Sequence, residues 1–186
     1  ETEQRPMNVG ALVVLRGRKP RRGVSAADDL VRRMLLCPVG APFNQRLAEN
    51  TLAGWPMLVV DEHIDPSEQV FRHALPTGSG LPALLDRVCA LHSRRLDRCR
   101  PLWEMHVFDG LADGRIGLYF KTHHGLIDGI GFIRVVLNVV SHTATARRPQ
   151  AIWQGLPQSA GQGSKEMLDT GSLLQAGREA GRTAGD

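Results

Sequence analysis

Two adjacent histidines and a nearby aspartate are the strongest candidates for chemistry in this sequence. His123, His124 and Asp128 lie in "FKTHHGLIDGIGF", residues 120–132, between two apolar stretches. Histidine suits general-base work because its ordinary pKa of about 6.5 leaves it largely neutral near pH 7. The group has three interpretations: a proton-transfer site, a metal site, or a structural junction in which Asp128 caps a helix.

The spacing of the histidines disfavours a metal site. Adjacent side chains of a strand point to opposite faces, so one ion could not easily bind both rings. Cys37, Cys89 and Cys99 lack CxxC spacing, which argues against a zinc cluster or a disulfide framework and predicts reduced thiols. The sequence has no GxSxG, GxxxxGKS/T, HExxH or GxGxxG pattern, so several common enzyme classes lack support. We therefore predict no metal.

The segment that leads into the motif alternates as a strand does. In "GRIGLYFKTHH", one face carries Ile116, Leu118 and Phe120. Continued alternation adds His124 to that apolar face and His123 to the other. Reactive groups are common where a strand ends and a loop begins. A neutral His124 beside apolar walls is therefore predicted to accept a proton from a bound hydroxyl.

Periodicity and capping signals predict the elements that position this strand. They are a strand over 7–15, a helix over 25–37 with Ser25 as its N-cap, a short strand within 55–65, a helix over 79–96, a strand over 102–110 and a helix over 125–142. The residues expected to face the core from the helix over 79–96 are Leu81, Leu84, Val88 and Leu91. The glycine-rich stretch "DGLADG", residues 109–114, predicts a hairpin.

The chain changes character after His142. Polar residues, proline and glycine dominate the next stretch, which predicts a flexible linker. We therefore divide the sequence into a lobe over 1–142, a linker over 143–166, and a possible linker helix over 167–186 that leads toward a partner surface.

Composition predicts a globular protein with a basic surface. Hydrophobic residues make up 42% of the 186 residues, and the formal net charge is +4. The basic runs are short and aromatic residues are only 5%, which argues against nucleic-acid binding. The chain has no run of about eighteen apolar residues, and its first ten residues lack the apolar core of a signal peptide. These features predict a cytoplasmic location.

Three stretches carry a resemblance to a known family. "HHGLIDG", residues 123–129, matches HHxxxDG, the signature of the CoA-dependent acyltransferase superfamily. "LDRCRPLWEMHVFDGL" resembles the PLW segment of the bacterial wax ester synthase/diacylglycerol acyltransferase family, and "PMNVGALVVL" resembles its first strand. The stretches occur in the family's order, and the similarity covers Pro6 to Val140. The sequence therefore resembles the N-terminal half of such proteins.

The resemblance implies a fold and a reaction. The fold is of the α+β class, with a mixed sheet flanked by helices. It is similar to one lobe of chloramphenicol acetyltransferase, and it forms one half of a two-lobed structure with a tunnel between the lobes. The reaction transfers a fatty acyl group from acyl-CoA, a substrate, to a long-chain alcohol or diacylglycerol. No cofactor is implied.

The resemblance also implies roles for the motif residues. His124 would be the general base, and His123 would support the loop. Asp128 would be structural, paired with an arginine for which Arg98 and Arg100 are the candidates.

The remaining family residues carry expectations of their own. Gly129 would permit close packing beside the site. The PLW residues Pro101, Leu102 and Trp103 would be structural or would line the tunnel.

Family members carry a second lobe that this sequence lacks. The resemblance therefore implies a C-terminal half of the same protein as a partner, either in one polypeptide or as a separate chain. A lipid droplet or the inner membrane surface is a further expected partner. Two alternatives stay open: another HHxxxDG acyltransferase of condensation or polyketide-ester type, and a noncatalytic module that binds a lipid surface.

Overall fold

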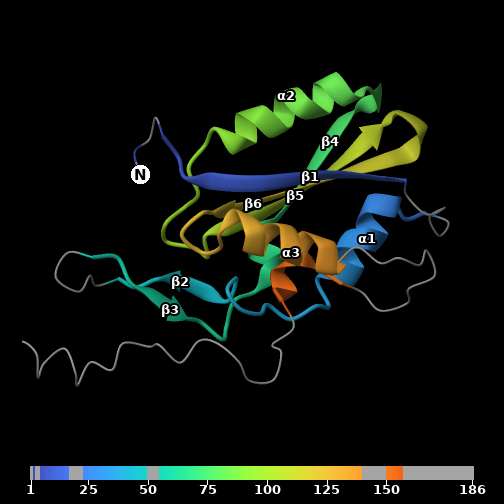
Figure 1. Ribbon diagram of the computed structural model, residues 1–186. Coiled ribbons are helices and arrows are strands. Elements are labelled where there is room, and N and C mark those ends of the chain that lie inside the picture. The colour runs from blue at the N-terminus through green and yellow to red at the C-terminus, as the bar shows by residue number, and fades with distance from the viewer. Residues whose placement is uncertain (1, 3–4, 17–22, 50–54, 140–149, 157–186) are drawn as a thin grey trace, which may run out of the picture. The chain divides into compact units, whose positions relative to one another are not determined.

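A four-stranded mixed sheet forms the centre of the lobe, in the order β1-β6-β5-β4 (Figure 1). The outer strand β1 (Asn8–Arg16) pairs antiparallel with β6 (Arg115–His123), which pairs antiparallel with β5 (Trp103–Leu111). The other outer strand, β4 (Val70–Ser79), runs parallel to β5. The predicted α+β class with a mixed sheet flanked by helices is confirmed.

The chain is represented by a computed structural model. Its described residues are 2, 5–16, 23–49, 55–139 and 150–156. They belong to a unit that ends at Leu156, and residues 157–186 form a second unit that lies outside the described residues. The helix predicted over 167–186 therefore lies outside them as well.

Strands β5 and β6 form the hairpin expected from their alternation. A short 3-10 helix, η2 (Ala112–Gly114), connects them. Gly110, near the end of β5, has a φ of +90°, a conformation that only glycine adopts readily. A side chain at this position would also collide with the carbonyl oxygen of Leu75 on β4. The glycine predicted as part of a turn thus lets two strands approach each other closely.

Helices cover both faces of the sheet (Figure 1). Helices α1 (Ala26–Met34) and α3 (Gly129–Val139) pack on one face, and α2 (Leu81–His92) packs on the other. The predicted N-cap is confirmed, because the hydroxyl of Ser25 accepts a hydrogen bond from the amide of Asp28 at 3.0 Å. None of the helices in the described residues is both long and apolar enough to cross a membrane.

The alternation of the strands sorts the buried side chains into two cores. The core beneath α1 and α3 includes Trp103, Met105, Val107, Ile116, Phe120, Phe132 and Val135. The smaller core beneath α2 includes Leu75, Leu84, Val88, Phe108, Leu111 and Tyr119. Leu91 is partly buried against the smaller core, as expected, but Leu81 is 45% exposed. Leu81 is the first residue of the helix, and the side chains that α2 buries are Leu84 and Val88 of its later turns.

A second, smaller sheet and a short helix precede β4. Strand β2 (Gln45–Leu47) pairs antiparallel with β3 (Leu58–Val60), and the 3-10 helix η1 (Pro66–Gln69) follows. The short strand predicted within 55–65 is confirmed as β3. All of its side chains are exposed.

The boundary predicted at residue 142 is wrong for part of the segment that follows. Ala151, Ile152 and Trp153 are buried in the core under α3, and a 3-10 helix, η3 (Ile152–Gln154), holds them there. Local polarity predicted a linker over 143–166, but Trp153 packs against residues far away in the chain. Residues 150–156 therefore belong to the lobe. The rest of the predicted linker lies outside the described residues.

Candidate active site

Backbone hydrogen bonds hold the histidine motif where three strand ends meet. The amide of His123, the last residue of β6, donates to the carbonyl oxygen of Leu102 at 2.9 Å, just before β5 begins. The amide of His124 donates to the carbonyl oxygen of Met7 at 2.8 Å, just before β1 begins. Main-chain contacts to two neighbouring strands thus fix the position of both histidines.

The side chain of His123 folds the loop back on itself. Its Nδ1 accepts a hydrogen bond from the amide of Gly125 at 2.9 Å, and its carbonyl oxygen accepts one from the amide of Leu126 at 3.0 Å. An accepting Nδ1 places the proton of a neutral His123 on Nε2. A Cβ at Gly125 would lie 3.0 Å from this Nδ1, so a larger residue would crowd the ring. This geometry agrees with the supporting role expected for His123.

His124 is exposed, and the inward orientation predicted for it is not found. Strand β6 ends at His123, so the alternation that would have turned His124 toward the apolar core stops one residue early. The ring is therefore open to a reactant that approaches from outside the lobe. Among the described residues, no group of three or more histidine, cysteine, aspartate or glutamate side chains could hold a metal ion.

Asp128 caps helix α3. Its Oδ1 accepts a hydrogen bond from the amide of Gly131 at 2.6 Å, and its carbonyl oxygen accepts one from the amide of Phe132 at 2.8 Å. The predicted pairing with Arg100 is not found in the described residues: Arg100 donates to the carbonyl oxygen of Glu68 at 3.1 Å and lies 3.7 Å from the carboxylate of Asp97. The structural-junction interpretation therefore describes this aspartate. The alternative partner, Arg98, stays a prediction.

Close packing at Gly129 is not found in the described residues. A Cβ on Gly129 would meet no atom within 4 Å. At Gly131, in contrast, a Cβ would lie 3.1 Å from Oδ1 of Asp128 and 3.0 Å from Cγ1 of Ile127. The tighter packing is therefore at Gly131, which donates the capping hydrogen bond.

The PLW segment, residues 101–103, holds the motif through hydrogen bonds to the carbonyl oxygen of Leu102. The carbonyl oxygen of Leu102 accepts hydrogen bonds both from the amide of His123 and from the hydroxyl of Thr122, the latter at 3.1 Å. Trp103 is fully buried and donates from Nε1 to the carbonyl oxygen of Phe43 at 2.9 Å. Its ring stacks on that of Trp153, with centroids 5.5 Å apart. Leu102 and Trp103 are thus buried and hydrogen-bonded within the lobe, and Pro101 precedes them at partial exposure. Their expected role in lining a tunnel stays a prediction.

A buried polar cluster lies on the opposite face of β5 and β6, and sequence reasoning missed it. Lys121 is 1% exposed and donates from Nζ to the carbonyl oxygens of Leu91 and Arg94, at 3.0 and 2.6 Å. Its Nζ lies 3.7 Å from the carboxylate of Glu104, which also bonds the ring of His106 at 3.0 Å. The alternation that points Trp103 and Phe120 to one core points Glu104 and Lys121 to the other face, where they are paired across β5 and β6. The sequence pattern could therefore have predicted this charged pair.

Burial and mutual contact shift the titration of this cluster. Burial lowers the pKa of Lys121, and the nearby Glu104 carboxylate only partly opposes it. Burial tends to raise the pKa of Glu104, but the hydrogen bond from His106 and the charge of Lys121 outweigh it, so the pKa falls. Burial also lowers the pKa of His73, whose Nε2 lies 3.0 Å from Nδ1 of His106. Through Lys121, which lies two residues before His123, the cluster joins the C-terminal end of α2 to the sheet.

Comparison with known proteins identifies the family of this chain. The description "wax ester synthase/diacylglycerol acyltransferase catalytic domain" belongs to a family model that matches residues 1–185. A probable diacylglycerol O-acyltransferase of Mycobacterium tuberculosis is 33% identical over 191 residues, covering 95% of this chain and 38% of that protein. A second M. tuberculosis relative, a putative diacylglycerol O-acyltransferase, is 31% identical and covers 100% of this chain and 41% of its own length.

Solved structures agree with the sequence comparison. The wax ester synthase/diacylglycerol acyltransferase of Marinobacter aquaeolei VT8 superposes with a TM-score of 0.73 and 36% identity, over 82% of this chain and 38% of that one. A condensation domain of the enacyloxin polyketide synthase shares the fold, with a TM-score of 0.54 and 14% identity over 74% of this chain and 25% of that one. The chain thus spans about two fifths of the length of the two M. tuberculosis relatives and of the Marinobacter enzyme. It belongs to the wax ester synthase/diacylglycerol acyltransferase catalytic-domain family.

Proposed function

We propose that this chain is the N-terminal half of an O-acyltransferase that moves a fatty acyl group from acyl-CoA to a long-chain alcohol or diacylglycerol. The observation that carries the proposal is the HHxxxDG motif itself, held by backbone contacts at three strand ends with the His124 ring exposed. The names of the family and of the relatives, wax ester synthase and diacylglycerol acyltransferase, support this kind of acyl transfer.

In the proposed reaction His124 acts as the general base. The hydroxyl oxygen of the acceptor attacks the thioester carbonyl carbon, and the His124 imidazole takes the hydroxyl proton. The tetrahedral intermediate then collapses, the carbon–sulfur bond breaks, and the CoA thiolate receives that proton. The acyl group passes directly to the acceptor, so no nucleophilic side chain and no cofactor is needed. His123 and Asp128 hold the loop and take no proton.

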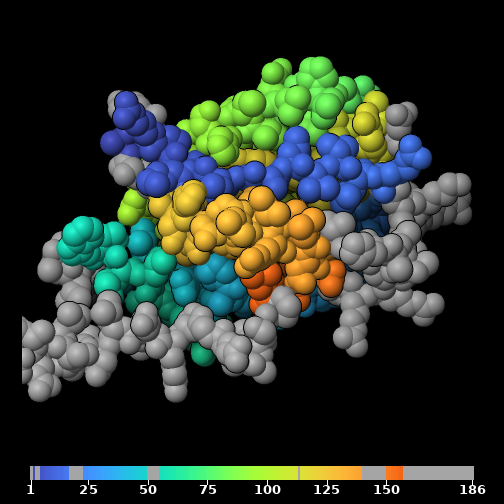
Figure 2. Space-filling view, viewed as in Figure 1, coloured from blue at the N-terminus to red at the C-terminus, as the bar shows by residue number. Residues whose placement is uncertain are grey.

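The second half of the family's fold would complete the site. Helix α3, which follows the motif, exposes three large apolar side chains: Ile130, Ile133 and Leu137. The helix lies open on the face shown in Figure 2. Exposed apolar residues in such a row mark an interaction surface. The relatives are more than twice as long as this chain, and we assign this face to the C-terminal lobe, which would supply the groups that bind the oxyanion and CoA.

Substitution of the base tests the proposal. The longest polypeptide that carries these 186 residues would be assayed with radiolabelled acyl-CoA and either hexadecanol or diacylglycerol. We expect His124→Ala to reduce turnover by about 10²–10⁴-fold, the contribution of a general base, and to leave the melting temperature nearly unchanged, because the ring is exposed. His63→Ala, which removes another exposed imidazole, is the matched control. Equal turnover in the two variants would contradict the proposed role.

The same assay separates the alternatives. Product only with an amine or a carrier-bound acceptor would indicate a condensation-type enzyme, whose fold this lobe shares. A noncatalytic module on a lipid droplet or membrane surface would bind liposomes equally well with and without His124, and neither form would turn over.

A further inference from the structure

Helix α2 ends beside the start of β1, and a side chain of that strand is bonded to it (Figure 1). The last carbonyl groups of a helix have no partners within the helix. Asn8, the first residue of β1, donates from Nδ2 to two oxygens at this end, those of His92 and Arg94, both at 2.9 Å. Nζ of Lys121 on β6 donates to the oxygens of Leu91 and, again, Arg94. The carbonyl oxygen of Arg94 thus joins both strands to the end of the helix.

A tyrosine makes a further contact with the same end of α2. Nδ1 of His92 lies 2.6 Å from the hydroxyl of Tyr119, which belongs to β6. Burial raises the pKa of Tyr119, so this hydroxyl stays neutral. Gly10 of β1 leaves room for the ring, because a Cβ at this position would lie 2.7 Å from it. The end of the helix is therefore held by polar side chains from β1 and from β6.

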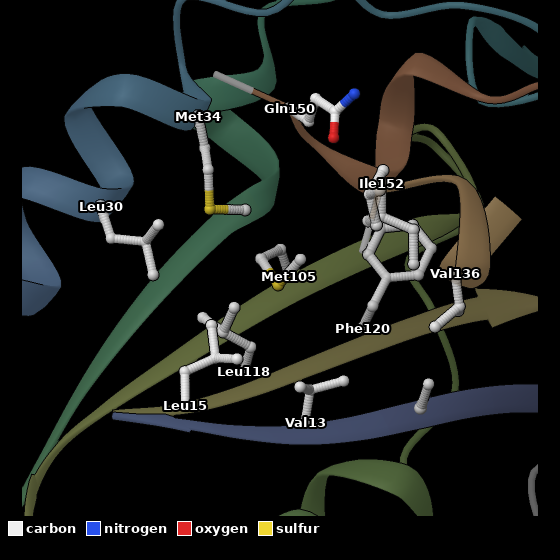
Figure 3. Close-up of a pocket in the computed structure, with 12 residues that line it drawn as sticks. Val13, Leu15, Leu30, Met34, Met105, Leu118, Phe120, Val136, Gln150 and Ile152 are labelled. Carbon is white, nitrogen blue, oxygen red and sulfur yellow. The ribbon is translucent and has the colours of Figure 1, made fainter. Parts of the chain in front are cut away.

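The other face of the same strands presents apolar side chains. Figure 3 shows Val13 of β1 and Phe120 of β6 there, and Gln150 is the one polar residue that it labels. Apolar packing has no preferred direction, whereas a hydrogen bond fixes both a distance and an angle. The two hydrogen bonds of Asn8 therefore fix the start of β1 more closely than the apolar packing on the opposite face does.

The start of β1 also holds the histidine motif. Asn8 is paired with His123 across β1 and β6. The residue before it, Met7, accepts the hydrogen bond from the amide of His124. Because Met7 and Asn8 are consecutive, any shift of Asn8 away from the end of α2 also moves the oxygen that holds His124. One short segment thus connects the helix end with the proposed base.

We propose that Asn8 is a positioning residue for His124. Its side chain fixes the start of β1 against the end of α2, and the carbonyl oxygen of Met7 then fixes the backbone of the histidine. Its effect on catalysis rests on the proposed function, in which His124 is the general base. A misplacement of about 1 Å in a reacting group can cost roughly a hundredfold in rate, so loss of this attachment should be visible in turnover.

Asn8→Leu tests the proposal, because leucine branches as asparagine does but has no donor; Asn8→Ala takes its place if the leucine variant does not fold. In the longest polypeptide that carries these residues, we expect kcat to fall by about 10–100-fold, with KM for acyl-CoA and for the acceptor nearly unchanged. Val14→Ala is the matched control, since Val14 is half-buried on the same strand and packs on the same face. It should lower the melting temperature and keep kcat. Equal kcat values in the two folded variants would overturn the proposal.

Amide hydrogen exchange measures the attachment without any turnover. The exchange rate of the His124 amide is divided by that of Leu118, in the middle of β6, so that a general loss of stability cancels. We expect Asn8→Leu to raise this ratio several-fold and Val14→Ala to leave it unchanged. If no acceptor yields product but this pattern holds, the proposed reaction fails while the role of Asn8 in holding the motif stands. A ratio that Asn8→Leu leaves unchanged would overturn that role.

Discussion

Replacement of Trp153 by alanine should destabilise the lobe far more than replacement of the exposed Trp55. Trp153 is fully buried, stacks on Trp103, and donates from Nε1 to the carbonyl oxygen of Cys37 at 3.2 Å. It lies in a segment whose polar composition predicts a linker. If residues 150–156 were only loosely attached, the loss of this ring would cost little.

The expected cost follows from the burial of the side chain. A buried tryptophan removes about 150–250 Å² from water, which at about 25 cal/mol/Å² is worth roughly 4–6 kcal/mol. The lost hydrogen bond adds about 1 kcal/mol, and relaxation of the cavity returns part of the total. We therefore expect Trp153→Ala to lower the free energy of unfolding by about 4 kcal/mol. A domain of this size loses about 2–4 °C of melting temperature per kcal/mol, so the melting temperature should fall by roughly 8–16 °C.

Urea denaturation followed by circular dichroism measures this change directly. The control is Trp55→Ala, the same substitution at a side chain that is 75% exposed, for which we expect less than about 0.5 kcal/mol. A difference between the two variants below about 1 kcal/mol would show that the η3 segment does not belong to the folded lobe. It would return the domain boundary to residue 142.

Two further predictions concern the ends of the motif and the polar cluster. Asp128→Ala should lower the free energy of unfolding by about 1 kcal/mol and reduce activity, because α3 loses its cap. Asp128→Asn can still cap α3 and should keep most of the stability and activity. An unchanged melting temperature for Asp128→Ala would contradict the capping role. The pKa of His73 is lowered by burial, so the unfolded chain binds more protons and stability should fall as the pH drops below about 6.5. His73→Gln should flatten that part of the melting profile and His63→Gln should not, and identical profiles would contradict the assignment.

The elements that the sequence predicted are those whose burial repeats regularly along the chain. Alternation placed Met105 and Val107 of β5 in one core, and the capping pattern at Ser25 located the start of α1. Strand β4 escaped notice because it is an edge strand with mostly exposed side chains, interrupted by proline and glycine. Trp153 escaped for another reason: its hydrogen-bond partner Cys37 lies 116 positions earlier, and no local pattern reports such a contact.

The spacing of the residues identified the motif, but it did not predict how the two histidine rings are oriented. Alternation predicted opposite faces for His123 and His124, but it assumed that β6 continues through both. The strand ends at His123 because Nδ1 of that residue captures the amide of Gly125 and starts a turn. The side chain that decides where the strand stops is therefore the supporting histidine, and no periodicity could reveal it.

In the proposed reaction, the two histidines together meet the requirements of a general base. A base needs a fixed position, and its ring nitrogen must be free to bind the reactant's proton. The carbonyl oxygens of Leu102 and Met7 fix the backbone of the pair, and the ring of His123 fixes the turn that follows. None of these contacts uses the imidazole of His124. The fold thus places this ring at a strand end through main-chain bonds alone, which is why its removal should cost turnover and leave stability nearly intact.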